Sequence, residues 1–438
     1  MHTRIKIIKF NKNGINFDIS FIIIDEIQSE TLKNTFPLNR LNNQEFEEII
    51  EHKRQKSKKL YKPEDLSGIE SEIYSLASFN SNNIMLKFIE MTGNVNKFEI
   101  FARTIKKWAK NHFIYDGQFG FLNGATLNVL VIKVLLLYFD SSLLYLLQNF
   151  FQTYMEWFDN LFTLIKYRLL NINSRDWQNI VSLDELTNKP LSWSSEEELN
   201  KRKGLYLGKK FGVSEKEMKR LENHANLIMV VLTPGYPKQN CSFNVNYSTR
   251  QIIKKELEIA YSFRSSQNNL GNNMLINAKN TYEEMSLINN WMNWLNGVNF
   301  LDKYKHYLLI LCISTHYNLK ENVNYCRYVE SRIRLELVFS IEDDNLIKYA
   351  HAFSKENWLP NKIKQKFGGH ITQHWWIGIE TYEQIIQIEI YNSIEGNILK
   401  NFVDRIQTNT PIALRKSGGW LEMFYYNKEN DKNIFKNY

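Results

Sequence analysis

The residues best suited to chemistry lie between positions 94 and 130. Four cations recur there at the spacing of one helix face: Arg103, Lys106, Lys107 and Lys110. The turn that follows holds an aromatic ring and three glycines: Tyr115, Gly117, Gly120 and Gly124. Cations, a ring and bare backbone at a helix N-terminus suit a nucleoside triphosphate, because they match its phosphates, its base and its need for amide donors. A solvated helix face followed by an ordinary turn gives the same pattern, so both interpretations stay open on these residues alone.

A second candidate is a single carboxylate, Asp18, near the start of the chain. It lies within residues 15–24, which with residues 5–10 read as two apolar strands joined by a hairpin turn at Asn13-Gly14. A carboxylate in such a strand is costly to bury unless it is paired, exposed or bound to a metal. Exposure at a sheet edge and metal binding are both open interpretations of this residue.

The helix that carries the cationic stripe is predicted from its apolar positions. These recur every three or four residues, which is typical of a face turned toward a core: Val95, Phe98, Ala102, Ile105, Trp108 and Ala109. Long helices are expected to about residue 170, with a turn at 77–83 before the stripe. Further on, we expect a helix at 214–224, a strand at 227–232, a helix at 249–262 and a surface loop at 264–277.

The last third of the chain has a different pattern. Strand-like runs and amphipathic helices alternate in the order strand, helix, strand, strand, helix, strand: residues 304–313, 322–341, 346–353, 373–380, 397–407 and 412–426. This order predicts a ferredoxin-like domain of the type found in RNA-recognition motifs.

Length and composition limit the class of protein. The 438 residues are too many for one core, so about two or three domains are expected. A formal charge of +8 favours a polyanionic partner. The three cysteines show no metal-ligand spacing and no disulfide framework. The most apolar run, residues 127–151, is interrupted by Lys133 and Asp140, which favours buried helices over a membrane span. We expect a soluble intracellular protein.

Several segments resemble the eukaryotic nuclear poly(A) polymerase family, in that family's order. Residues 105–125 read IKKWAKNHFIYDGQFGFLNGA, where the family has a pattern of the type IKLWAKxxxIYxNxxGFxGGV. Residues 232–249 read LTPGYPKQNCSFNVNYST and are similar to its ITPAYPxxNSxYNVSxST signature. Shorter likenesses occur in GINFDISF at 14–21, SLASFNSNN at 75–83, FLDKYKHY at 300–307 and YVESRIR at 328–334. The similarity covers nearly the whole chain.

The resemblance implies a role for individual residues. Asp18 stands at the third catalytic carboxylate, which binds metal and helps to position the attacking 3′-hydroxyl. Lys106 stands at a lysine that contacts the triphosphate, and Tyr115 at a tyrosine beside the base and sugar of ATP. Gly124 and Ala125 stand at a Gly-Val pair that approaches the nucleotide.

Departures from the family pattern surround the nucleotide positions. Gly117 replaces an asparagine near the adenine, Asn123 replaces a glycine, and Ala125 is smaller than the usual valine. Selectivity for ATP over other nucleotides is therefore a weaker expectation than the fold.

The resemblance implies an α+β protein of three parts. Residues 1–30 would be a remnant of the nucleotidyltransferase catalytic domain, most of which is missing. Residues 31–298 would form the helical central domain, and residues 299–438 the RNA-binding domain. The implied substrate is ATP, with Mg²⁺ or Mn²⁺ as cofactor. The implied partners are RNA 3′ ends and cleavage and polyadenylation factors, and the implied state is a monomer in the nucleus without membrane contact.

The catalytic carboxylates are the largest departure. Nucleotidyl transfer uses two divalent ions bridged by carboxylates, and in this family two of the three carboxylates arrive as a D-x-D ahead of the third. No acidic residue precedes Asp18, and no D-x-D occurs in the 438 residues. One carboxylate cannot hold two hard cations that prefer octahedral oxygen ligation. We therefore expect the chain as given to be catalytically inactive.

Three hypotheses remain. The first is an enzyme that adds adenylate from ATP to RNA 3′ ends without a template, which requires that the protein begin upstream of Met1. The second is a non-catalytic RNA-binding or interaction protein derived from a poly(A) polymerase. The third, from the pattern alone, is an unrelated helical protein with an RNA-recognition-like domain.

Overall fold

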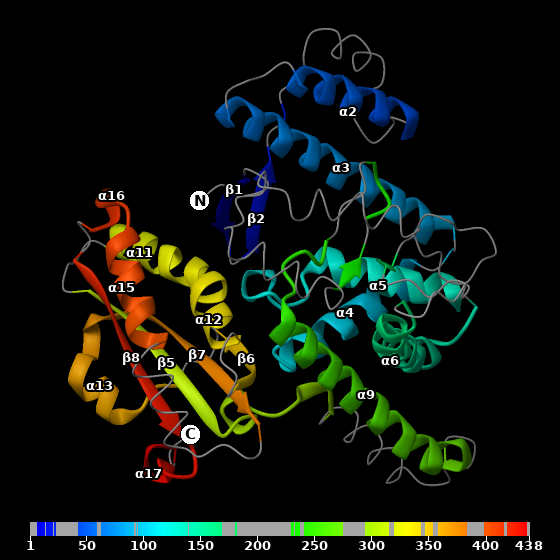
Figure 1. Cartoon of the computed structure of the whole chain (residues 1–438). Coiled ribbons are helices and arrows are strands. Elements are labelled where there is room, and N and C mark those ends of the chain that lie inside the picture. Colours follow the sequence, from blue (N-terminus) through cyan, green and yellow to red (C-terminus); the bar gives the residue numbers. More distant parts are fainter. Residues whose placement is uncertain are drawn as a thin grey trace. The chain divides into compact units, whose positions relative to one another are not determined.

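The computed structural model in Figure 1 divides the chain into two compact units. The first comprises Met1–Ile105 and Gly124–Phe243, and the second comprises Lys106–Asn123 and Asn244–Tyr438. The residues described are 7–13, 15–20, 22, 43–58, 63–91, 93, 95–138, 140–168, 180–181, 229–231, 233–236, 241–274, 294–314, 319–342, 347–353, 358–382, 398–415 and 418–435. The predicted helix at 214–224 lies outside these residues.

The first unit begins with the predicted hairpin. β1 (Ile7–Lys12) pairs antiparallel with β2 (Ile15–Ser20), and Asn13 in the turn has φ 54°. Asparagine tolerates this left-handed conformation better than most residues, and tight hairpins require it. The rings of Phe10 and Phe17 stack with their centroids 4.9 Å apart across the pair.

Two long helices follow, α2 (Asn43–Lys58) and α3 (Pro63–Met91). Their contact is an apolar cluster of Phe46, Ile49, Ile50, Ile73 and Leu76, all buried. At its border the Lys53 ammonium, on a side chain only 4% exposed, lies 2.8 Å from the Glu72 carboxylate. The ion pair offsets the cost of removing the lysine charge from water.

The predicted turn at residues 77–83 is wrong, because α3 continues through it. Serine and asparagine favour turns by competing for backbone hydrogen bonds. Here the hydroxyls of Ser75, Ser78 and Ser81 each donate to the carbonyl four residues earlier, at 2.7–2.9 Å. The serine hydroxyls therefore find hydrogen-bond acceptors within the helix, and burial of Leu76 and Ala77 favours the helical form.

The first unit also contains an apolar helix pair and a short strand pair. α5 (Gly124–Leu137) and α6 (Leu143–Arg168) confirm the predicted long helices, and the Tyr154 hydroxyl donates to the carbonyl of Leu130 at 2.8 Å. β3 (Ile180–Val181) and β4 (Val230–Val231) pair in parallel. None of the helices in the described ranges is long and apolar enough to cross a membrane.

α9 (Tyr247–Met274) belongs to the second unit and is longer than predicted. The segment 264–277 was expected as a surface loop from its Asn, Ser and Gly content, but the helix runs through it to Met274. The cost of one internal glycine, Gly271, is about 1 kcal/mol, and an established helix propagates past it.

The second unit contains a four-stranded antiparallel sheet. Its strands are β5 (His306–Ser314), β6 (Ile347–Phe353), β7 (Ile371–Thr381) and β8 (Gly419–Asn427), in the order β6-β7-β5-β8. All nine residues of the central strand β5 are buried. The predicted alternation of strands and helices is confirmed, with α11 (Leu319–Arg332), η6 (Ile333–Val338) and α12 (Phe339–Glu342) between β5 and β6, and α15 (Lys400–Asn409) before β8.

Some short elements of this unit were not predicted. α13 (Asn361–Phe367) lies between β6 and β7 and is followed by η7 (Gly368–His370). Residues 412–415, expected at the start of the last strand, form the short helix α16 (Ile412–Arg415) instead. Pro411 precedes it with a fixed helical φ, and its carbonyl accepts from the amide of Leu414 at 2.8 Å.

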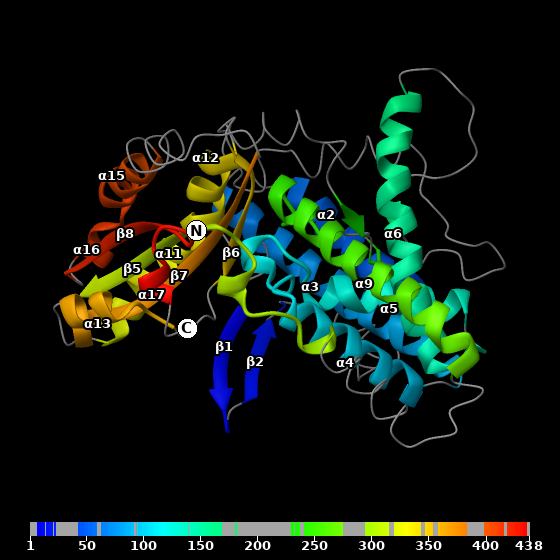
Figure 2. The same ribbon diagram turned by 90° about the horizontal axis from the view of Figure 1, so that it is seen from below.

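Both faces of the sheet are covered. Trp375 of β7 donates from its indole to Glu330 on α11 at 3.2 Å, whereas the next residue, Trp376, packs against Trp358 and Phe435. Figure 2 shows α12 and α15 on one side of the sheet and α13 and α17 (Lys432–Phe435) on the other. Both tryptophans are fully buried and therefore belong to the core.

Candidate functional site

The predicted amphipathic helix is α4 (Val95–Asn111). Phe101, Ile105, Trp108 and Ala109 are fully buried on one face. The cations of the stripe are exposed on the other: Arg103, Lys106, Lys107 and Lys110. The helix thus presents its lysines to solvent next to the turn that the sequence singles out.

The structure brings two lysines of the stripe to the ring of Tyr115. The Lys106 and Lys110 ammonium groups lie 5.4 Å and 5.5 Å from the ring centroid. Both distances are within the range of cation–π attraction. One half-buried ring and two cations one helical turn apart therefore share a single small area, which can offer stacking to a base and charge to phosphates.

The end of α4 is held in an uncommon backbone conformation. The amide of Ile114 donates to Ala109 O and that of Phe113 to Lys110 O, which is the Schellman arrangement of a helix C-terminus. The left-handed position in this motif, with φ 63°, is filled by Phe113 rather than glycine. This costs about 1–2 kcal/mol, so the surroundings must hold the residue in place.

Packing around Phe113 supplies that support. Its ring meets Phe300 and Phe353 edge to face, with centroids 5.3 Å and 4.7 Å away. Its carbonyl accepts a hydrogen bond from His351 Nε2 at 2.9 Å. The backbone that enters the Tyr115 turn is therefore tied to β6 and to η5 (Phe300–Asp302).

The turn itself is closed by a side chain and a glycine. Asp116 Oδ1 accepts from the amide of Gln118 at the start of η2 (Gly117–Phe119). Gly120 ends η2 with φ 90°, and a Cβ at this position would lie 2.9 Å from the carbonyl oxygen of Asn244. Glycine is required at position 120 for both reasons.

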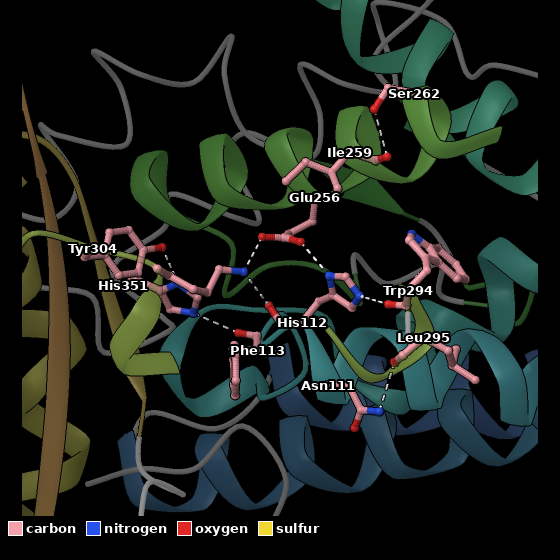
Figure 3. Close-up of polar contacts among 11 residues, drawn as sticks. Asn111, His112, Phe113, Glu256, Ile259, Ser262, Trp294, Leu295, Tyr304 and His351 are labelled. Atoms are coloured by element: carbon pink, nitrogen blue, oxygen red, sulfur yellow. Dashed lines mark hydrogen bonds and ion pairs between the residues drawn. The ribbon is translucent and has the colours of Figure 1, made fainter. Parts of the chain in front are cut away.

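A buried charge cluster lies behind the turn (Figure 3). The Glu256 carboxylate of α9, 2% exposed, accepts from His112 Nδ1 at 2.7 Å and forms an ion pair with Lys303. His112 Nε2 lies 2.9 Å from the carbonyl oxygen of Trp294. Both ring nitrogens of His112 thus lie within hydrogen-bonding distance of oxygen atoms.

Electrostatics keep the acid of this cluster ionised. Burial by itself raises the pKa of Glu256, but the hydrogen bond from His112 and the charge of Lys303 outweigh burial and hold the pKa below its ordinary value. An uncompensated carboxylate at this depth would be strongly destabilising. The cluster is therefore an interdependent set that joins the end of α4 to α9 and to the start of the sheet domain.

A neutral histidine, His351, completes the support (Figure 3). Its Nδ1 accepts from the Tyr304 hydroxyl at 2.6 Å, while Nε2–H donates to Phe113 O. Burial and the nearby Lys303 charge lower the pKa of His351 to about 3. The ring therefore stays neutral, with a single tautomer selected by its two partners.

The sequence-predicted site residues are divided between the two units. Lys106 and Tyr115 belong to the second unit, where they lie together. Gly124 and Ala125 are the first two residues of α5 and belong to the first unit, as does Asp18. Asp18 stands on β2 opposite Lys9 of β1.

The described residues do not fit a two-metal centre. Within the ranges given above, no group of three or more His, Cys, Asp or Glu side chains is arranged to hold a metal ion. Asp18 supplies one carboxylate, whereas two Mg²⁺ ions need several oxygen ligands in near-octahedral geometry.

Sequence reasoning did not find the charge cluster or its neutral neighbour: His112, Glu256, Lys303 and His351. The sequence features that could have pointed to these residues were indirect. His112 and Lys303 lie inside segments that resemble the family, and Glu256 is an acid flanked by Ile252, Ile253 and Leu257 on the buried side of its helix. The partners are 144 and 47 residues apart in sequence, so no local pattern links them.

A cationic helix end thus lies beside an aromatic turn, and both belong to the unit that contains the antiparallel sheet. Comparison with known domains finds matches in two segments. Residues 97–202 match the poly(A) polymerase central domain, and residues 299–367 match the poly(A) polymerase predicted RNA binding domain. The resemblance to poly(A) polymerases is thereby confirmed, because two parts of the chain match the central and RNA-binding domains of that family.

Individual relatives are similar at modest identity. A poly(A) polymerase of Dictyostelium discoideum is 23% identical over 300 residues, which cover 67% of this chain and 30% of that protein. Nuclear poly(A) polymerase 4 of Arabidopsis thaliana is 25% identical over 291 residues, covering 64% of this chain and 31% of that protein. The chain thus spans less than a third of the length of these curated relatives.

Proposed function

We propose that this chain is a poly(A) polymerase-type protein that serves template-independent transfer of AMP from ATP to RNA 3′ ends, and so mRNA polyadenylation. The observation that carries the proposal is the meeting of Lys106, Lys110 and Tyr115 inside the segment that matches the family's central domain. The match to the family's domains supports the reaction type, and this geometry supports the assignment of the nucleotide to the Tyr115 turn.

In the proposed ATP site, Lys106 contacts the triphosphate and Tyr115 packs beside the base and sugar. By the resemblance, Gly124 and Ala125 at the start of α5 would approach the nucleotide, since neither residue carries a bulky side chain. The cation–π positions of Lys106 and Lys110 support this assignment, because both ammonium groups already lie within reach of the ring where a base would stack. Their positive charge would be neutralised by phosphates on binding.

The RNA side of the proposal rests on the sheet domain. The strand order β6-β7-β5-β8 and the antiparallel pairing of all neighbours support a ferredoxin-like, RNA-recognition-type arrangement. We assign this domain to residues 299–438, the central domain to 31–298, and residues 1–30 to a catalytic-domain remnant. By analogy with relatives, we place the protein in the nucleus as a monomer that works with RNA and with cleavage and polyadenylation factors.

Asp18 is proposed as the third catalytic and metal-binding carboxylate. Because the 438 residues hold no D-x-D to complete the set, we expect the chain to bind ATP and RNA but not to join them without carboxylates from elsewhere. The same observation favours the second candidate function, a non-catalytic RNA-binding protein derived from a poly(A) polymerase.

The test is primer extension by the purified full chain. The chain is incubated with an RNA primer, ATP and Mg²⁺ or Mn²⁺, and RNA and ATP binding are measured in parallel. We expect binding of both ligands and no extension. Extension that survives Asp18→Ala would refute the carboxylate assignment, whereas failure to bind either ligand would refute the proposed function as a whole.

A further inference from the structure

A basic and aromatic surface stands apart from the Tyr115 turn, at α13 and the neighbouring end of the sheet. Lys362, Lys364 and Lys366 of α13 are all exposed, and no acidic residue occurs between positions 361 and 379. His370, also exposed, follows in η7. Such a run of cations without carboxylates is the electrostatic footprint of a polyanion-binding surface.

Two aromatic rings lie inside this cationic surface. Phe367, at the end of α13, and Phe424 of β8 are half-buried, with centroids 6.2 Å apart. The Lys366 ammonium lies 4.7 Å from the Phe367 centroid and 5.8 Å from that of Phe424. Rings with a cation directly beside them serve two functions at once, since bases stack on the rings and the cation meets the phosphate next to the stacked base.

The backbone beside the rings is open. A Cβ at Gly368 or at Gly369 would meet no atom within 4 Å, and Gly368 has φ 45°. Two consecutive glycines therefore leave bare peptide groups at the surface, where a sugar-phosphate chain can approach closely. Figure 2 shows α13 on the side of the sheet opposite α15.

We propose that Lys362, Lys364, Lys366, Phe367 and Phe424 form the surface on which this domain binds single-stranded RNA. The proposal rests on the proposed function and specifies its RNA-contacting surface. An acidic protein segment could form ion pairs with the lysines, but its carboxylates would not interact favourably with the two adjacent half-buried rings. Single-stranded RNA can contact both features, because its phosphates pair with the lysines and its bases stack on the rings, so RNA fits this surface better. Glu422 lies two residues before Phe424 on the same face of β8, and three lysines against this one carboxylate still leave a positive surface.

The test measures binding of the full chain to a labelled single-stranded oligoadenylate at several salt concentrations. The variant K362Q/K364Q/K366Q removes the three cations from an exposed helix and leaves the core untouched. The matched control is K87Q/K348Q/K400Q, which neutralises three exposed lysines on α3, β6 and α15. Phe424→Leu tests stacking, with thermal unfolding recorded to verify its fold.

We expect the α13 variant to bind about tenfold more weakly, and its plot of log affinity against log salt to become shallower by about 2, because three single-strand phosphate contacts are lost. The control should bind as the wild type does, and Phe424→Leu should weaken binding by roughly tenfold.

Two failures are distinguishable. If the wild type binds oligoadenylate and the α13 variant binds equally well with the same salt slope, this surface is not the RNA site, and an acidic protein becomes its better candidate partner. If the wild type itself does not bind oligoadenylate, the proposed function and the surface both fail. An unfolded Phe424→Leu leaves the decision to the lysine variant.

Discussion

At the scale of single residues, the candidate site depends on side chains that do not touch the proposed ligand. His112, Glu256 and Lys303 form a buried ionic set, and His351 is held neutral between Tyr304 and the Phe113 carbonyl. His112 lies three positions before Tyr115, so the set fixes the backbone from which the ring projects. Precise placement of a binding group usually needs such a supporting layer.

Glu256→Gln should show how strongly the fold depends on this set. The substitution leaves Lys303, 12% exposed, without its counter-charge, and breaking one partner of a buried pair costs about 3–5 kcal/mol. The measurement is the free energy of unfolding of the full chain in urea. The matched control is Glu258→Gln on the same helix, whose carboxylate pairs with Lys254 at 3.6 Å and is 47% exposed. Its loss should cost less than about 1 kcal/mol, and equal losses in the two variants would contradict the account.

His351 should make stability depend on pH. The pKa of its ring falls from 6.5 in a model peptide to about 3 in the folded protein, mainly through burial. Below pH 6.5 the His351 ring binds a proton in the unfolded chain but not in the folded chain. The free energy of unfolding therefore decreases as the pH falls from 6.5 toward 3. Urea unfolding at pH 7.5 and at pH 5 should show this loss, and His351→Gln should reduce it. If His351→Gln loses as much stability between pH 7.5 and pH 5 as the wild type does, His351 is not the group responsible. The control is His370→Gln, at an exposed histidine.

At the scale of elements, the structure joins α4, η2 and α5 through a turn whose conformation is set from outside. The Schellman end of α4 is completed by Phe113 in a left-handed conformation, and rings of η5 and β6 hold that residue. The turn therefore owes its shape to tertiary packing more than to local preference.

The pair Phe113→Gly and Phe113→Ala separates backbone strain from packing. Both variants lose the ring contacts with Phe300 and Phe353 and should be destabilised by about 2–4 kcal/mol. Glycine accepts φ 63° without strain and alanine does not, so Phe113→Gly should be the more stable of the two by about 1 kcal/mol. Thermal or urea unfolding checks the order, and an alanine variant more stable than the glycine variant would contradict the strain.

Elements with a strong periodic pattern were predictable, and those decided by distant contacts were not. The amphipathic α4 and the alternation of strands and helices along the sheet domain follow from local hydrophobic spacing. The turn expected at 77–83 failed because the serines bond along the helix, and α13 was missed because seven residues carry too little periodicity. The cluster around Glu256 joins residues up to 144 positions apart, which no window of sequence reveals.

At the scale of the whole molecule, the chain has segments that match the central and RNA-binding domains of poly(A) polymerases, and one candidate catalytic carboxylate, Asp18. Among the candidate residues, Lys106 and Tyr115 were predictable from residue type and spacing, and the structure brings them together. Asp18, Gly124 and Ala125 remain proposals that rest on the resemblance. Above all, we propose that the Lys106–Tyr115 segment binds ATP.

ATP binding by Lys106→Gln, compared with Lys107→Gln, tests that claim most directly. Both lysines are exposed neighbours on α4, and the Lys106 ammonium lies 5.4 Å from the Tyr115 centroid. Calorimetric titration of the full chain with ATP should show binding weakened by about 1–3 kcal/mol in Lys106→Gln, from a lost charge-assisted phosphate contact, and little change in Lys107→Gln. Equal ATP affinity in Lys106→Gln and the wild type, or no ATP binding by the wild type, would contradict it.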